Sequence, residues 1–196
     1  ALLLGGVALF SASGEVTREQ WRRYASTVQP HQRYPGIQGF GFSRLVRPDE
    51  LAAHEAQVRA EGFPSYQLRP PGPREHYTAI VYLEPFAKRN LRAFGYDMMS
   101  EPTRREAMAR ARDVGDTALS GIVTLVQEDG KNVQRGLLMY VPVYRGGAVP
   151  DPDQEGDDRP PPRAGRAGAA LAAHPADPRR AAAGGAGGGG RRRAGA

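Results

Sequence analysis

Cysteine is absent from this chain of 196 residues, which excludes disulfide bonds and thiolate metal sites. An initiator methionine is also absent, and the chain opens at Ala1 in the middle of an apolar pattern, so we expect a fragment or a processed product. The apolar segment 1–10 is shorter than the roughly 20 residues that a membrane-spanning helix needs. Two interpretations of residues 1–14 stay open: the core of a signal peptide, or the last turns of a longer N-terminal helix next to a membrane.

Catalytic and cofactor-binding motifs are missing as well. Gly39-Phe40-Gly41 lacks the third glycine and the helix start of a dinucleotide loop, and neither a G-x-S-x-G elbow nor a P-loop lysine occurs. None of the four histidines has the i, i+4 spacing of a metal-binding helix: His31, His54, His76 and His174. We therefore expect no catalytic centre, metal or cofactor, and an extracytoplasmic hydrolase is the weaker hypothesis.

Residues 150–196 contain no aromatic residue, isoleucine, valine or methionine, and Leu171 is their one leucine. Such a composition cannot bury enough apolar surface to offset the entropy of ordering the backbone, so we predict a disordered tail. Three explanations stay open: a solvated linker, a basic arm ending in Arg191-Arg192-Arg193 that contacts phosphates, or a GC-rich gene read out of frame. We favour the last, with the true reading frame ending near Val149–Asp153.

The formal net charge of +6 comes from an excess of arginine across the chain and not from one basic block. Charges of both signs are interspersed over residues 1–150, as on an ordinary solvated surface. We therefore expect no nucleic-acid binding by the folded part. The alternative function is a nucleic-acid-binding protein that uses the basic tail, which predicts salt-dependent retention on DNA.

Hydrophobic periodicity predicts an α+β domain with a PAS-like, mostly antiparallel sheet, flanking helices, a long N-terminal helix and a disordered C-terminal tail. Thr17 and Gln20 have the spacing of a capping box at the start of a helix. The glycines of the first strand allow a neighbouring strand to approach closely. Helices are expected over 17–28, 48–61 and 102–114, and strands over 37–44, 76–83, 118–127 and 134–144, the last two as a hairpin.

Several runs of residues then follow one another in a characteristic order. The chain contains Pro-Gly-Ile-Gln at 35–38, Glu-Gly-Phe at 61–63, a Tyr-rich strand ending in Glu-Pro at 85, Gly-Tyr-Asp-Met-Met-Ser at 95–100 and Val-Pro-Val-Tyr at 141–144. The helix after the Asp-Met-Met-Ser turn carries Arg104-Arg105 and ends in Ala-Arg-Asp at 111–113. Together these motifs resemble those of bacterial CHASE domains, and the resemblance covers residues 15–149.

The resemblance implies a ligand-sensing domain outside the cytoplasmic membrane, flanked by membrane helices and followed by a histidine kinase or a diguanylate or adenylate cyclase. It favours the interpretation of residues 1–14 as the end of an N-terminal helix. The expected partners are an unidentified small molecule, the membrane through flanking helices outside this chain, and a second copy in a possible homodimer. No output domain is present, so no enzymatic activity of this chain is expected.

Family members bind their ligands in a PAS-like pocket, and five residues match its lining: Tyr82, Arg104, Ser120, Val126 and Tyr140. Cytokinin receptors of plants use an aspartate where this chain has Arg104, and a threonine where it has Tyr140. Because an arginine side chain donates hydrogen bonds and accepts none, cytokinin is not expected as a ligand. An anionic or carbonyl-bearing ligand would suit Arg104 better. Tyr82 and Tyr140 could equally be core residues, Arg104 a surface residue, and Asp97 a turn or cap residue.

Overall fold

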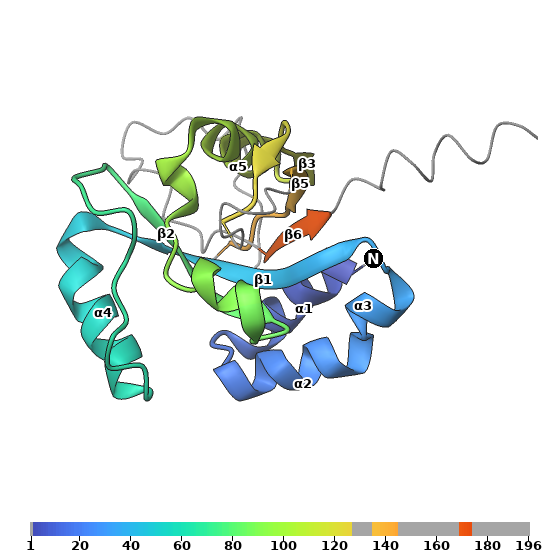
Figure 1. Ribbon diagram of the computed structural model, residues 1–196, viewed down its shortest axis with the longest axis horizontal. Coiled ribbons are helices and arrows are strands. Elements are labelled where there is room, and N and C mark those ends of the chain that lie inside the picture. Colours follow the sequence, from blue (N-terminus) through green and yellow to red (C-terminus); the bar gives the residue numbers. More distant parts are fainter. Residues whose placement is uncertain (1, 127–134, 145–168, 174–196) are drawn as a thin grey trace, which may run out of the picture.

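An antiparallel sheet lies between two layers of helices in the computed structural model, which describes residues 2–126, 135–144 and 169–173 (Figure 1). The helices are α1 (Leu2–Ser13), α2 (Arg18–Val28), α3 (Pro30–Arg33), α4 (Leu51–Ala60) and α5 (Pro102–Val114). Short 3-10 turns are η1 (Pro48–Glu50), η2 (Lys88–Ala93) and η3 (Met98–Ser100). The strands are β1 (Ile37–Val46), β2 (Tyr77–Glu84), β3 (Ala118–Leu119), β4 (Val123–Thr124), β5 (Arg135–Tyr140) and β6 (Ala169–Ala173).

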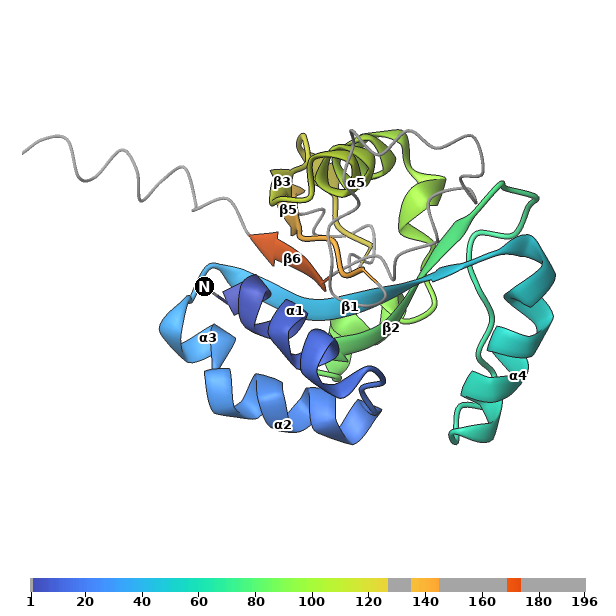
Figure 2. The ribbon, with the colours of Figure 1, turned by 180° about the vertical axis from the view of Figure 1, so that it is seen from behind.

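Helices α1 and α2 form an antiparallel pair on one face of the sheet (Figure 2). Gly14, with a φ of 64°, ends α1, and α2 then begins at the predicted capping box. The Thr17 hydroxyl accepts a hydrogen bond from the Gln20 amide (3.2 Å), and the Gln20 side chain accepts one from the Thr17 amide (2.7 Å). Gly14 and the extended Thr17 interrupt the helical backbone, so α1 is a separate helix and α2 begins directly after Thr17, as the capping box predicted.

The strands lie in the order β2-β1-β6-β5-β3, with β4 also paired to β5, and all of these pairs are antiparallel. This sheet and its helices confirm the predicted α+β class. The strand expected over 118–127 is divided into β3 and β4, because the Ser120 hydroxyl between them accepts the Leu138 amide of β5 at 2.9 Å. The predicted loop at 128–131 lies outside the described residues.

A β-bulge in β2 changes which side chains face each helical layer. The register between β1 and β2 shifts after the pair Phe42–Tyr82. The next residue of β1, Ser43, pairs with Ile80, so Val81 is an extra residue of β2 that has no partner in β1. An extra residue reverses the inward and outward alternation of a strand. Ile80 and Leu83 consequently pack on the α5 side, whereas Val81 and Tyr82 both pack on the side of α1 and α2.

Glycine at position 41 permits the close approach of β1 to this bulge. A Cβ atom on Gly41 would lie 2.5 Å from the backbone oxygen of Tyr82 and 3.1 Å from the Leu83 side chain. Contacts of that length are shorter than van der Waals separation allows, so a larger residue would push the two strands apart. The expectation that glycines in this strand serve close packing is confirmed at Gly41.

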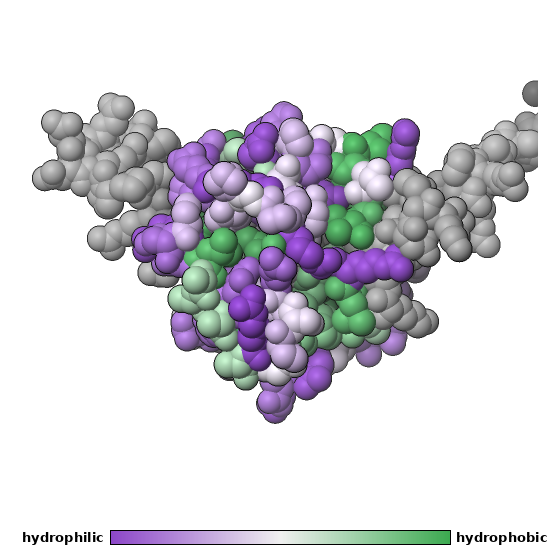
Figure 3. All heavy atoms as spheres, turned by 60° about the vertical axis from the view of Figure 1, so that its left-hand side comes forward, coloured by the Kyte–Doolittle hydropathy of each residue, from purple (hydrophilic) through white to green (hydrophobic). Residues whose placement is uncertain are grey.

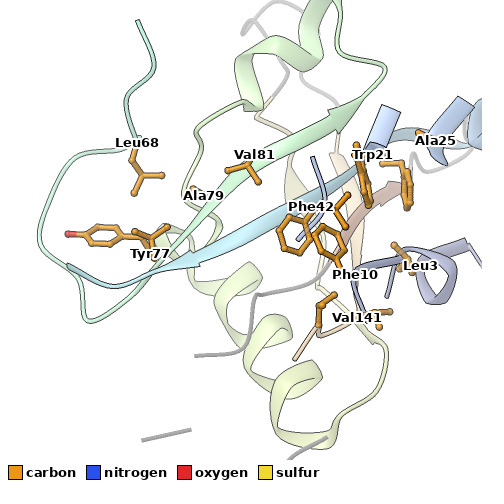
Figure 4. Packing of buried hydrophobic residues seen from close by; sticks show 14 of the residues in the cluster. Leu3, Phe10, Trp21, Ala25, Phe42, Leu68, Tyr77, Ala79, Val81 and Val141 are labelled. Atoms are coloured by element: carbon orange, nitrogen blue, oxygen red, sulfur yellow. The ribbon is translucent and has the colours of Figure 1, made fainter. Parts of the chain in front are cut away.

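Two hydrophobic clusters hold the layers together. On the α1–α2 side, Phe10 lies beside Phe42 (Figure 4), with 4.0 Å between the ring centroids. Trp21 stacks on Phe40 at 4.8 Å. On the α5 side, the second cluster joins side chains of α5, β2 and β5, among them Met108. On the surface in Figure 3, hydrophobic residues form separate patches with hydrophilic residues between them. The aromatic side chains of Phe10, Phe40 and Phe42 are thus buried together around Trp21.

Strand β6 lies within the segment 150–196 that we predicted to be disordered. Residues Ala169–Ala173 pair with β1 on one side and with β5 on the other. These five residues form a strand in the structure, where we predicted disorder. The rest of the tail lies outside the described residues. The physical reason is that β1 and β5 each present a row of backbone N–H and C=O groups. A strand without proline can satisfy these groups whatever its side chains are.

Candidate functional site

Arg104 lies on the first turn of α5, with its guanidinium inside the α5-side cluster. The helix begins at Glu101, whose carboxylate accepts hydrogen bonds from the Thr103 and Arg104 amides, and Pro102 occupies its first position. The Arg104 residue is 2% exposed, so it is a buried cation and not a surface residue. Sequence reasoning alone leaned towards a surface position, because arginine is seldom fully buried.

The Arg104 guanidinium is only partly satisfied by its surroundings. One Nη donates to the Thr124 carbonyl oxygen at 2.6 Å, the other approaches the Met98 sulfur at 3.9 Å, and the group lies 5.0 Å from the centre of the Tyr96 ring. The Nε has no hydrogen-bond partner among the described residues, since the Glu101 carboxylate lies 3.8 Å away. A buried cation with free donor capacity can bind a carboxylate or a carbonyl group strongly.

The charge state of Glu101 supports this site. Partial burial acts to raise the pKa of Glu101, but hydrogen bonds from the Thr103 and Arg104 amides outweigh it and leave the pKa below its ordinary value. The carboxylate is therefore ionised at neutral pH. It caps α5 and balances part of the Arg104 charge at the same time.

Tyr140 lies at the end of β5 on the same face. It is 2% exposed, and its hydroxyl has no hydrogen-bond partner among the residues that the structure describes. Burial raises the pKa of Tyr140, and nearby Arg104 opposes the shift only in part, so the hydroxyl remains protonated. A buried hydroxyl without a partner costs free energy, and a ligand oxygen or a water molecule would recover it.

Ser120 and Val126 lie on the same face but contribute differently. The Ser120 hydroxyl accepts a hydrogen bond from the Leu138 amide and donates one to the Gly121 oxygen at 2.7 Å. Backbone groups therefore already occupy the hydroxyl both as acceptor and as donor. Val126 is half-buried and packs against the α5-side cluster. Ser120 therefore positions β5, and Val126 supplies apolar surface.

Tyr82 does not lie with the other four predicted pocket residues, and its role in ligand binding stays a prediction. Its hydroxyl donates to the Val16 carbonyl oxygen at 2.7 Å, and its ring lies 6.1 Å from that of Trp21, on the opposite face of the sheet. Regular alternation from Ile80 would have placed Tyr82 on the α5 side. The bulge at Val81 reverses the alternation, and no local sequence signal showed it.

Asp97 supports the site from beneath, as the cap residue that its position after Gly95 suggested. Its fully buried carboxylate accepts from the Thr78 amide at 2.8 Å and from the Met99 amide at 3.1 Å, and its other oxygen lies 3.3 Å from Arg74. These contacts tie β2 to the turn that leads into α5. Asp97 therefore fixes the position from which α5 presents Arg104.

Sequence reasoning missed Ser43 and Tyr96. The Ser43 hydroxyl is buried and has no hydrogen-bond partner within the described part of the chain, and Tyr96 packs on the Arg104 guanidinium. Alternation in β1 placed Ser43 with the glycines, away from Phe40 and Phe42, which was the available signal. Nothing in the sequence singled out Tyr96 from the other tyrosines.

Metal and membrane sites are not evident in what the structure describes. Within residues 2–126, 135–144 and 169–173, no three His, Asp or Glu side chains gather closely enough to hold a metal ion. In the same ranges, the helices are too short or too polar to cross a bilayer.

Comparison with known proteins identifies a family. The family model described as the CHASE domain matches residues 14–174, which is most of the chain. The match passes residue 149, where we expected the domain to end, and includes β6. No curated protein matches the chain. CHASE domains are sensory and not catalytic, and are typically extracytoplasmic parts of membrane receptors. On the strength of this match, the chain belongs to the CHASE domain family.

Proposed function

We propose that this domain binds a small molecule bearing a carboxylate or carbonyl group on the α5 side of its sheet, as the extracytoplasmic sensor of a transmembrane receptor. One observation carries the proposal: the buried Arg104 guanidinium keeps free donor capacity beside the buried Tyr140 hydroxyl, which has no partner among the described residues. Burying these donors without a hydrogen-bond partner costs free energy. A ligand oxygen that accepts from both would remove that cost and so add to the binding free energy.

The bulge in β2 offers a route from this site to the N-terminal helices. Ile80 belongs to the α5-side cluster, while the adjacent Val81 oxygen accepts a hydrogen bond from Arg18 of α2 at 2.6 Å. Tyr82 donates to Val16, in the connection between α1 and α2. A ligand that prefers one position of α5 and β2 would bias these contacts, and signalling needs only that difference in affinity.

The cytoplasmic output is part of the same proposal. CHASE domains precede histidine kinases and diguanylate or adenylate cyclases, so we propose one of these as the output domain of the full receptor. Flanking membrane helices would carry the bias across the bilayer, and a homodimer would let two such helices move against each other. Genomic DNA on both sides of the coding region tests this directly.

The binding site is tested by a thermal-shift screen of small carboxylates and carbonyl compounds, followed by calorimetry. Tyr140→Phe removes only the hydroxyl and should weaken the binding of a hit about 5- to 30-fold, the value of one to two hydrogen bonds. Arg104→Gln should abolish measurable binding, whereas the exposed neighbour Arg105→Gln should leave it unchanged. Unaltered affinity in both site variants would overturn the site.

Nucleic-acid binding is the competing outcome. If the chain is retained on DNA at low salt, and retention vanishes when residues 174–196 are removed, the basic tail carries the function instead. This truncation keeps the strand Ala169–Ala173. The sensor proposal expects no such retention and a thermal shift that does not depend on residues 174–196.

A further inference from the structure

A cleft of about 70 Å³ lies on the other face of the sheet, between α4 and the connection of α1 to α2. Its apolar and aromatic lining comes from six residues: Phe10, Val16, Phe42, Val58, Val81 and Tyr82. A single water needs about 10–15 Å³ of such space, so the cleft has room for roughly five groups of that size. Six polar side chains also line it: Glu15, Arg18, Arg44, His54, Gln57 and Glu61.

His54 of α4 lines this cleft and carries a buried ring nitrogen without a hydrogen-bond partner in the described part of the chain. It is 5% exposed, its Nε2 lies 2.9 Å from the Tyr66 hydroxyl, and its Nδ1 has no partner among the described residues. Burial, together with nearby Arg44, lowers the pKa of His54 to about 4, so the ring is neutral at pH 7. When the Tyr66 hydroxyl donates its proton to Nε2, the proton of the neutral ring is on Nδ1, which then is a donor.

Arg44 supplies the positive charge. Arg44 lines the cleft, and its guanidinium donates a long hydrogen bond of 3.4 Å to the Gln57 side chain. Arg18, the other cation, is already committed to Glu61 at 3.1 Å and to the Val81 oxygen. Glu15 is exposed at the rim. The formal charges of the lining, two arginines and two glutamates, sum to zero, and Arg44 is the cation whose side-chain hydrogen bond goes to a neutral group. Arg44 can therefore bind one negative charge, while Glu15 and Glu61 disfavour a second.

We propose that this cleft is a second binding site, for a short-chain monocarboxylate held by Arg44 and the Nδ1–H of His54, with its alkyl group against Phe10 and Phe42. The site is separate from Arg104 and Tyr140, on the opposite face of the sheet, and does not depend on the function proposed for them. An occupant would touch both α4 and Val16 in the α1–α2 connection. The site is thus positioned to stabilise one arrangement of the N-terminal helices.

The test uses acetate and propionate as probes on the full chain, at constant ionic strength kept with sodium chloride. Ring resonances of His54 are followed by NMR during each titration. We expect saturable shifts for both probes, tighter binding of propionate, and none of these effects with chloride alone. Arg44→Gln should weaken binding at least fivefold, while the exposed Arg22→Gln on α2 should not change it.

A second variant shows whether a loss of binding in Arg44→Gln comes from the binding site or from misfolding. Gln57→Glu keeps the length of the side chain and pairs Arg44 internally, so it should also weaken binding at least fivefold with an unchanged melting temperature. Arg104→Gln should leave the His54 shifts intact, which separates this site from the one on the α5 side. Shifts that chloride reproduces, or that persist equally in Arg44→Gln and Gln57→Glu, would overturn the proposal.

Discussion

Three buried polar residues carry the two binding sites that we propose. Among the described residues, Arg104 and Tyr140 have polar atoms without hydrogen-bond partners on one face of the sheet, and His54 has one on the other. Each such group lowers the stability of the empty protein, because its desolvation is not repaid. Proteins retain such groups where a ligand or a change of state compensates for the cost.

The stability of the fold should depend on pH through His54. The unfolded ring takes up a proton near its ordinary pKa of 6.5, whereas the folded ring does so only at about 4. Falling pH therefore favours the unfolded chain: the stability is fully present above pH 6.5 and is lost progressively down to pH 4. From the size of the shift, the free energy of unfolding should fall by up to about 3 kcal/mol over this interval.

Urea unfolding of the wild type and of His54→Gln, between pH 7 and pH 4, measures this loss. The charged groups that act on the ring are Arg44, Glu50 and Glu55, and all three remain in the variant. His54→Gln should flatten the pH dependence, whereas His76→Gln, at a half-exposed histidine, should keep it. An identical slope in His54→Gln and in the wild type would show that another group titrates.

Helix ends and strand irregularities decide the layout at the scale of elements. The capping box at Thr17 sets the start of α2, and the left-handed Gly115 (φ 73°) ends α5 where we predicted. The bulge in β2 sends Val81 and Tyr82 to the N-terminal layer. Local residue types predicted both helix ends, while the bulge required knowledge of the partner strand.

The cap of α2 can be tested with a matched pair of variants. Thr17→Ala removes the hydroxyl that accepts the Gln20 amide and should lower the free energy of unfolding by about 1 kcal/mol. Ser26→Ala removes an exposed hydroxyl on the same helix, one that bonds only the Arg23 carbonyl, and alanine favours helix, so it should cost close to nothing. Chemical denaturation of both variants measures the difference. Equal effects would mean that the capping box does not stabilise α2.

At the scale of the whole molecule, the sheet depends on a strand from the far end of the chain. Strand β6 stands between β1 and β5, which otherwise have no direct pairing in the described part of the sheet. The space between them needs a strand whatever its side chains are, since both neighbours expose backbone groups there. The hypothesis of a tail read out of frame stays a prediction, and the coding DNA tests it.

Truncation tests the role of β6. A chain that ends at Gly168 lacks the strand, and each backbone hydrogen bond lost should cost about 0.5–1.5 kcal/mol, so its urea midpoint should drop sharply. A chain that ends at Ala173 keeps the strand and should match the full chain. If both truncated chains unfold at the same midpoint as the full chain, β6 adds nothing to the sheet.

The sequence by itself determined the types of the elements, their order and the family. Capping residues, alternation and the turn glycines act over a few neighbouring residues, so they can be read without the fold. Four of the five predicted pocket residues do lie on one face: Arg104, Ser120, Val126 and Tyr140.

Only the tertiary structure decided the face on which Tyr82 lies, the burial of Arg104 and the strand formed by Ala169–Ala173. Each of these depends on a partner distant in the chain: Ser43 opposite the bulge, Thr124 beside the guanidinium, and β1 beside β6. Local patterns carry no record of such partners, because the same residues could meet others at the same spacing.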